Sequence, residues 1–317
     1  MAIDNLEAVK INDSDQWIRV RGKNMKAPLI LHVQAGPGFP MIPEAHAIEK
    51  NLHLENNYLV AYWDQRACGK SFDENTDPKT ITLPQLTDDV ICCTKYLLRK
   101  YQKKKAIIIG YSQGATLALM AAAKDETIFD HLFLVGTDID LPPANSYAIE
   151  YAMAKAKEKN KGALLKLAID LNKIPVVNAK LFQKRAKLLT NLGGIKRNTS
   201  YNRLVVETVL NMISSKAYRL NDIPKTIKGM EFCQDALLVE FNNLNLFQKI
   251  SGVDVPVHFV NGKHDAIAPF ETATRYYEYL RADKKTFTSF DHSAHMPHYD
   301  EPEKFARLLR DTLNGTV

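Results

Sequence analysis

The stretch Ala106–Ala123, AIIIGYSQGATLALMAAA, decides the fold of this chain. It begins with an apolar run rich in β-branched residues, which predicts a buried strand, and it ends in alanines and leucines, which predict a helix. Between them lies Gly110-Tyr111-Ser112-Gln113-Gly114, a G-x-S-x-G pattern typical of a nucleophile elbow. The two glycines remove side chains that a sharp turn would bring into collision. We therefore expect Ser112 to be a nucleophile, although a serine that only caps the helix remains an alternative reading.

The composition is that of an ordinary globular protein, with 45% hydrophobic and 25% charged residues in a chain of 317. The net charge is +6, but Lys and Arg are spread along the chain rather than clustered as in a nucleic-acid module. The four cysteines lack the spacing of a disulfide framework or a zinc site: Cys68, Cys92, Cys93 and Cys233. There is no secretory signal pattern and no apolar stretch near the roughly 18 residues of a membrane span. We expect a cytoplasmic protein with neither nucleic acid nor membrane as a partner.

Strands and helices alternate on both sides of the elbow. The segment Asn5–Lys23 predicts a hairpin at a sheet edge. Apolar runs predict further strands at Pro28–Val33, Tyr58–Trp63, His131–Gly136, Val255–Val260 and Thr286–Phe290. Helices are expected at Ala45–Leu54, Thr82–Tyr101, Phe270–Leu280 and Pro302–Leu313. This rhythm predicts an α/β protein with a mostly parallel, twisted sheet flanked by helices.

The rhythm changes at Pro142-Pro143, and from Ala144 to about Ile250 the chain reads as successive helices. We predict a core domain formed by residues 1–143 and 251–317, with residues 144–250 forming a helical lid over the carboxyl edge of the sheet. A helical domain with no bearing on the site is the alternative.

Three side chains are candidates for a catalytic triad. A serine hydroxyl needs a base within reach, and the base needs a carboxylate to orient it. Ser112, Asp265 and His295 each follow a predicted strand, in the order Ser…Asp…His. Groups on such loops gather at the carboxyl edge of a parallel sheet.

Other residues compete for these roles. Asp138 and Asp140 follow the strand after the elbow and could supply the acid, and His292 is the main competitor of His295 as the base. Asp291 lies too near the base loop to orient His295 well. His264 and His298 are most simply loop imidazoles.

The reaction also needs donors for a developing oxyanion. One is expected from the backbone N–H of Gln113, after the nucleophile, and one from Gly36, in the loop after the strand ending at Val33. A plain turn is the alternative reading of Gly36-Pro37-Gly38.

With these motifs the chain resembles the proline iminopeptidase-like branch of the α/β-hydrolase superfamily, peptidase family S33. Gln34–Gly38 stands where that branch typically carries H-G-G-P-G, and Asp64–Ser71 nearly matches its D-Q-R-G-x-G-x-S. Gly262–Pro269 and Ala294-His295 match its acid and base loops. The resemblance extends over the sheet-forming parts of the chain and implies an α/β-hydrolase fold with a helical lid.

The resemblance also implies a substrate-binding site. Peptidases of this branch hold the substrate's free amino group with acidic residues, mostly in the lid, and the lid glutamates Glu207, Glu231 and Glu240 are the candidates. Solvated helix glutamates are the alternative. The usual elbow tryptophan is replaced by Gln113, which alters the wall of the acyl pocket.

We therefore expect a serine hydrolase that cleaves a small ester or amide through an acyl-enzyme, with an aminopeptidase preferred over a carboxylesterase. A non-catalytic ligand-binding homologue and a lyase are the alternatives from other classes. No H-E-x-x-H pattern is present, so neither a metal nor another cofactor is expected. The expected partner is a small-molecule or short-peptide substrate, and a homodimer is left open.

Overall fold

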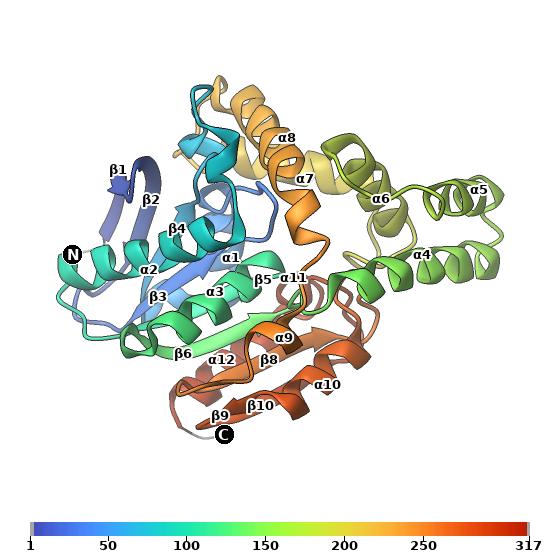
Figure 1. Cartoon of the computed structure of the whole chain (residues 1–317). Helices are drawn as coiled ribbons and strands as arrows, with labels where there is room; N and C mark the ends of the chain where they lie inside the picture. The colour runs from blue at the N-terminus through green and yellow to red at the C-terminus, as the bar shows by residue number, and fades with distance from the viewer. Residues whose placement is uncertain (1–2, 316–317) are drawn as a thin grey trace.

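A central sheet of eight strands forms the middle of the molecule in the computed structural model, which describes residues 3–315 (Figure 1). The strand order is β1-β2-β4-β3-β5-β6-β8-β10, and a separate pair is formed by β7 and β9. Pairing is parallel from β4 to β10 and antiparallel only for β1 with β2 and β2 with β4. The predicted mostly parallel sheet is confirmed. The strands are β1 Ile3–Ile11, β2 Ser14–Gly22, β3 Leu29–Val33, β4 Leu59–Asp64, β5 Ala106–Tyr111, β6 Phe129–Val135, β7 Gly252–Val253, β8 Val257–Gly262, β9 Arg281–Ala282 and β10 Lys285–Phe290.

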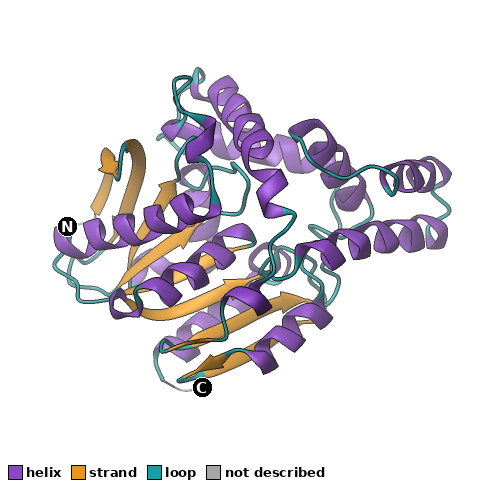
Figure 2. Ribbon diagram, in the orientation of Figure 1, coloured by secondary structure: helices purple, strands orange, loops and turns teal. Residues whose placement is uncertain are grey.

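Helices cover both faces of the sheet, as Figure 2 shows. One apolar core lies between the sheet and α2, α3 and α10, with Leu97, Leu117 and Tyr276 among its members. A second core contains side chains of α1 and α12, such as Ile48 and Phe305. Every residue of β3, β4, β5 and β8 is buried, and apolar residues predominate in β3, β4 and β5 because helices cover both faces of these strands. The helices are α1 Ala45–Leu52, α2 Leu83–Lys100, α3 Gln113–Lys124, α4 Leu141–Glu158, α5 Gly162–Leu171, α6 Ala179–Asn191, α7 Tyr201–Ser214, α8 Asp222–Phe241, α9 Leu246–Lys249, α10 Phe270–Tyr279, α11 Pro297–Asp300 and α12 Pro302–Leu313.

Helices α4–α8 gather beyond one end of the sheet (Figure 1). The two chain segments that connect them to the sheet lie side by side, because Leu246 N–H donates to the Ile139 carbonyl and Leu141 N–H donates to the Leu244 carbonyl. We call α4–α8 the lid. Its assignment as a separate domain over residues 144–250 stays a prediction.

A buried ion pair fastens the loop after β4 to α2. The Arg66 guanidinium donates to both carboxylate oxygens of Asp89, at 2.8 and 3.0 Å, and the Gln16 amide donates to the same carboxylate at 2.9 Å. Both charged side chains are almost fully buried. A buried charge is tolerated only when it is paired and hydrogen-bonded. This cluster therefore holds the loop after β4 in one conformation.

Candidate active site

Ser112 lies at the turn between β5 and α3 with a left-handed φ of 52°. A Cβ atom on Gly110 would stand 2.6 Å from Ala115 Cα, and one on Gly114 would stand 2.3 Å from the Gln34 carbonyl oxygen. No side chain fits at either place, which accounts for both glycines of the motif. The Ser112 backbone N–H donates to the Val135 carbonyl of β6 at 2.8 Å, so the strained residue is held by the neighbouring strand.

The expected base and acid are in contact. His295 Nδ1 lies 2.8 Å from Asp265 Oδ2, and the other oxygen of the fully buried Asp265 accepts the backbone N–H groups of Ile267 and Ala268 at 2.8 and 2.9 Å. Burial lowers the pKa of His295, but the charge and hydrogen bond of Asp265 outweigh it and raise the pKa above its usual value. With Nδ1 bonded to the carboxylate, Nε2 is the nitrogen left to accept a proton.

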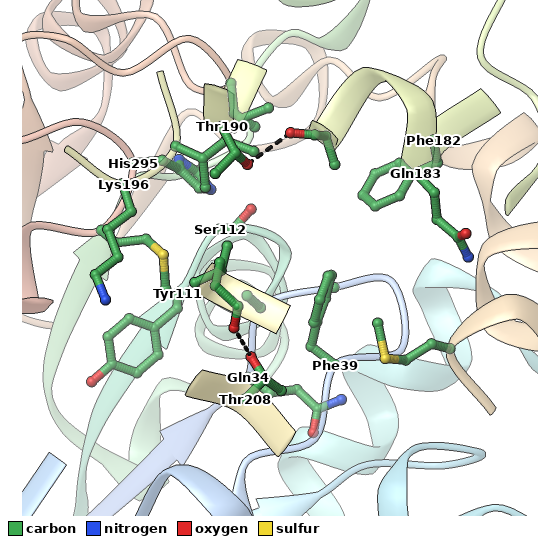
Figure 3. Close-up of a pocket in the computed structure, with 18 of the residues that line it drawn as sticks. Gln34, Phe39, Tyr111, Ser112, Phe182, Gln183, Thr190, Lys196, Thr208 and His295 are labelled. Atoms are coloured by element: carbon green, nitrogen blue, oxygen red, sulfur yellow. Dashed lines mark hydrogen bonds between the residues drawn. The ribbon is translucent and has the colours of Figure 1, made fainter. Parts of the chain in front are cut away.

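The Ser112 hydroxyl donates to a different carboxylate, Asp138 Oδ2, at 2.9 Å. Asp138 follows β6 and is buried, and burial raises its pKa to about 6. Within residues 3–315 no hydrogen bond joins Ser112 to His295 in this conformation, yet both side chains line one cavity (Figure 3). The sequence raised Asp138 as an alternative acid for the histidine; the structure places it on the serine instead.

Most of the remaining alternatives are not lining residues of the cavity. Asp140 pairs through its backbone with Asn245, and the exposed Asp291 forms an ion pair with Lys263 at 2.7 Å. His292 is exposed. His264 is half-buried in the loop that carries Asp265. His298 is buried and lines the cavity.

His298 packs between two tyrosines. Its ring centroid lies 4.5 Å from that of Tyr111 and 4.4 Å from that of Tyr299, and burial lowers the pKa of His298 to about 3. A neutral ring in the cavity wall therefore replaces the solvated loop imidazole that the sequence suggested.

The two residues expected to stabilise an oxyanion are neighbours. Gln113 is the first residue of α3, so its backbone N–H has no acceptor within the helix. A Cβ on Gly36 would stand 1.6 Å from the Gln113 side-chain oxygen, so a larger residue here would require the Gln113 side chain to move. Gly36 and Ser112 both line the cavity, with the N-terminal end of α3 next to the serine.

The cavity beside Ser112 has a volume of about 470 Å³ and a mostly apolar wall. Its lining comes from the loops after β3, β5 and β6 and from α4, α6, α7 and α8 of the lid. Figure 3 shows Phe182 and Gln183 of α6 across the open space from Ser112 and His295. The lid and the strand-end loops thus enclose one chamber.

Only two of the three candidate lid glutamates line the cavity. Glu207 and Glu231 line the cavity, where Glu207 is paired with Lys196 at 2.7 Å and with Arg203 at 3.0 Å. Glu240 is not a lining residue: its carboxylate accepts the Leu83 N–H at the start of α2, at 3.1 Å. The expectation that Glu240 binds substrate is corrected on this ground. A carboxylate at a helix N-terminus accepts a hydrogen bond from a free backbone N–H and interacts favourably with the positive end of the helix dipole.

Glu44 and Arg185 are among the charged cavity residues that the sequence analysis missed. Glu44 precedes α1 and accepts hydrogen bonds from the Tyr299 hydroxyl and from the Asn211 amide, the latter at 3.2 Å, and burial raises its pKa. Arg185 lies on α6 and is buried. No motif singles out either residue, since each is one charged residue among many in a helical or turn pattern.

The Asp64–Ser71 loop is hydrogen-bonded to residues of the cavity wall. The buried Asp64 carboxylate accepts the backbone N–H groups of Met41 and Ile42 at 2.8 and 2.9 Å, the Lys70 N–H at 3.1 Å and the Tyr218 hydroxyl. Met41 lines the cavity, so this carboxylate fixes part of the wall.

Residues 3–315 contain neither a cluster of metal ligands nor a membrane-spanning helix. No group of three or more His, Cys, Asp or Glu side chains is arranged to hold a metal ion. None of the described helices has both the length and the apolar character needed to cross a membrane.

Comparisons with known proteins agree with this geometry. The model of the alpha/beta hydrolase fold family matches residues 36–302. A curated relative, "Probable aminopeptidase YbaC" of Bacillus subtilis (strain 168), is 27% identical over 306 residues, covering 96% of this chain and 94% of the relative.

Solved structures share the fold at low identity. VinJ superposes with a TM-score of 0.73 at 17% identity, over 99% of both chains. The proline iminopeptidase of Mycobacterium smegmatis gives 0.68 at 15% over 98% of both, and the esterase EaEST of Exiguobacterium antarcticum gives 0.63 at 16% over 99% of this chain and 100% of its own. The chain belongs to the α/β-hydrolase family, and it resembles that family's proline iminopeptidase-like branch.

Proposed function

We propose that this protein is a serine hydrolase that cleaves a small amide or ester through an acyl-enzyme, and that its preferred reaction is the removal of an N-terminal amino acid. The observation that carries the proposal is the 2.8 Å contact between Asp265 and His295 at a cavity that also holds Ser112 on a nucleophile elbow.

The proposed reaction begins with a rotation of the Ser112 side chain. The hydroxyl leaves Asp138 and donates to Nε2 of His295, which accepts its proton as Oγ attacks the substrate carbonyl. The backbone N–H groups of Gln113 and Gly36 hold the negative oxygen of the tetrahedral intermediate. His295 then returns the proton to the leaving amine, and water attacks the acyl-enzyme by the same route in reverse. Asp265 keeps the imidazole oriented and stabilises its cation.

Carboxylates near the serine support the aminopeptidase reading. The ammonium of an N-terminal residue is attached to the carbon next to the scissile carbonyl, so a group that binds it must lie close to the nucleophile. Asp138 contacts Ser112 directly, and Glu44, Glu207 and Glu231 also line the cavity. The curated relative named as a probable aminopeptidase points the same way. The mostly apolar wall favours the second candidate, a carboxylesterase.

A fluorophosphonate probe tests the nucleophile. The folded protein should be labelled at Ser112, and Ser112→Ala should lose both labelling and turnover with an unchanged unfolding midpoint. An unlabelled Ser112 in folded protein would refute the mechanism.

A substrate panel tests the preferred reaction. Alanyl and prolyl p-nitroanilides should be cleaved, and N-acetylation of either should lower kcat/KM by about 100-fold, the value of a lost charge-assisted contact of about 3 kcal/mol. Equal cleavage of free and acetylated substrates, with rapid cleavage of p-nitrophenyl esters, would assign the protein to the carboxylesterases.

A further inference from the structure

Arg185 is a buried cation in the wall of the cavity. It projects from α6 of the lid, its side chain and backbone together are only 6% exposed, and it lines the chamber that contains Ser112. Its guanidinium donates from Nη1 to the Asn145 side-chain oxygen and lies 5.7 Å from the centre of the Phe182 ring. These contacts hold the arginine against the lid without neutralising its charge.

No carboxylate neutralises this guanidinium at ion-pair distance among residues 3–315. Asp138 is the acidic group whose charge acts on it, from beyond 4 Å, and Asp138 is itself hydrogen-bonded to Ser112. The other cation of the wall, Lys196, is paired with Glu207 at 2.7 Å. Burial lowers the pKa of Arg185 to about 10, which still leaves the side chain charged at neutral pH.

A buried guanidinium with most of its five donors unused is costly unless an anion meets it. Structural arginines avoid this cost by a bidentate carboxylate, as Arg66 does with Asp89 in the same molecule. At Arg185 the free donors border the cavity instead. The planar guanidinium matches a carboxylate of the ligand in the same two-point geometry.

We propose that Arg185 binds a carboxylate of the substrate, so that the preferred substrates of this hydrolase are acidic amino-acid or peptide derivatives. The inference rests on the proposed function for the reaction itself, but the anion site is a property of the cavity. Arg185 lines the same cavity as Ser112, His295 and Asp138, so the guanidinium borders the chamber in which the scissile bond lies. The carboxylate therefore belongs to one of the two residues that flank the scissile bond.

That carboxylate has two sources, which two substrate pairs distinguish. Glutamyl against glutaminyl p-nitroanilide tests a side-chain carboxylate on the acyl part. Ala-Ala against Ala-Ala-amide tests the terminal carboxylate of the leaving group. In one pair the acidic member should have the higher kcat/KM, by about 10- to 100-fold, the range of a charge-assisted hydrogen bond.

Arg185→Gln should abolish that preference, whereas Lys184→Gln, which removes the same charge from an exposed position on the same helix, should keep it. Arg185→Lys retains the charge without the two-point fork and should keep only part of it. If Arg185→Gln does not fold, the wild-type ratio and the Arg185→Lys variant decide. A wild-type enzyme that favours the neutral member of both pairs, or an unchanged preference in Arg185→Gln or Arg185→Lys, would overturn the inference.

A binding experiment separates this inference from the proposed function. Calorimetry on the Ser112→Ala protein should detect glutarate and not its neutral diamide, and adding Arg185→Gln should weaken glutarate binding by at least about 10-fold. Glutarate binding without hydrolysis of any substrate would refute the hydrolase and leave the anion site standing. Hydrolysis without acidic preference or glutarate binding would refute the anion site alone.

Discussion

Single glycines set the shape of the elbow, and one substitution tests this. In Gly114→Ala the new methyl would lie 2.3 Å from the carbonyl oxygens of both Val33 and Gln34, which are backbone atoms of β3 and its loop and cannot move alone. We expect a loss of about 3 kcal/mol in the free energy of unfolding, at the upper end of overpacking costs. Gly162→Ala at the start of α5 is the matched control, because its methyl would meet nothing within 4 Å. Urea denaturation should find that control unchanged or stabilised by up to about 1 kcal/mol, and equal effects of the two substitutions would contradict the explanation.

Burial of Asp138 disfavours the charged form of its carboxyl group. Burial raises its pKa from 3.8 to about 6, so its contribution to stability is fully present below pH 3.8 and is lost as the pH rises through about 6. The asparagine in Asp138→Asn resembles the neutral carboxyl at every pH. The variant should therefore match the wild type near pH 4 and be more stable at pH 8, by up to about 3 kcal/mol.

Thermal unfolding at a series of pH values measures this difference. Asp130→Asn serves as the control, because Asp130 is exposed at the opposite end of β6, and its effect on stability should be small, as for other surface substitutions. An Asp138→Asn protein that loses stability at pH 8 would show that the carboxylate is matched by His295 and Arg185 after all.

Among the elements, those with a strong local signal were predicted well. Strands β3, β4 and β5 are mostly apolar because both faces are buried. Helix α2 begins one residue after Thr82, whose side chain accepts the Gln85 N–H at 3.3 Å. The short strands β7 and β9 have two residues each, too few for any periodicity.

Two prolines stand at the start of the lid. Pro142 and Pro143 marked the change of rhythm in the sequence, and both lie in the first turn of α4, which begins at Leu141. Proline is well tolerated there, since those residues have no helical acceptor for an N–H. The prolines therefore mark the beginning of the first lid helix.

Asp64 links the loop after β3 to the loop after β4 through its hydrogen bonds. Outside the elbow, its substitution should therefore cause the largest loss in the free energy of unfolding. Asp64→Ala leaves the Met41 and Ile42 N–H groups and the Tyr218 hydroxyl without their acceptor in a buried place, while the Lys70 N–H keeps its contact with the Tyr218 hydroxyl oxygen at 3.2 Å. At about 1 kcal/mol or more for each buried donor left unpaired, the free energy of unfolding should fall by about 3 kcal/mol. Tyr218→Phe removes one donor and keeps the other three, so its cost should be near 1 kcal/mol. Guanidinium denaturation measures both, and equal losses would show that the tyrosine alone holds the loop.

Across the whole molecule, chain order predicted which loops lie together at the edge of the sheet, but not how their side chains are oriented. Ser112, Asp265 and His295 follow strands of one parallel sheet, so topology alone brings their loops to one edge. The Ser112 contact with Asp138 depends on a side-chain rotation, and Arg185 reaches the cavity through helix packing. Neither rotamers nor the packing of lid helices leave a pattern in a single sequence.

Two buried thiols report whether the lid opens apart from the core. Cys68 in the loop after β4 and Cys233 on α8 face each other with their sulfur atoms 3.9 Å apart, so separation of lid and core exposes both together. Cys93 is buried between α2 and the sheet and is exposed only when the core unfolds, while Cys92 is partly exposed already. Hydrogen bonding to Cys233 and burial raise the pKa of Cys68, and burial raises that of Cys93, which slows alkylation of either thiol until it is exposed.

Iodoacetamide labelling followed by mass spectrometry should therefore modify Cys92 first, Cys68 and Cys233 together at a slower common rate, and Cys93 last. Because local openings cost less free energy than global unfolding, we expect at least about 10-fold between the last two rates. A ligand that bridges the lid and the loops should slow the middle rate and leave that of Cys92 unchanged. If Cys68 and Cys233 react no faster than Cys93, the lid does not open on its own, and substrate must reach Ser112 through a gap between closed helices.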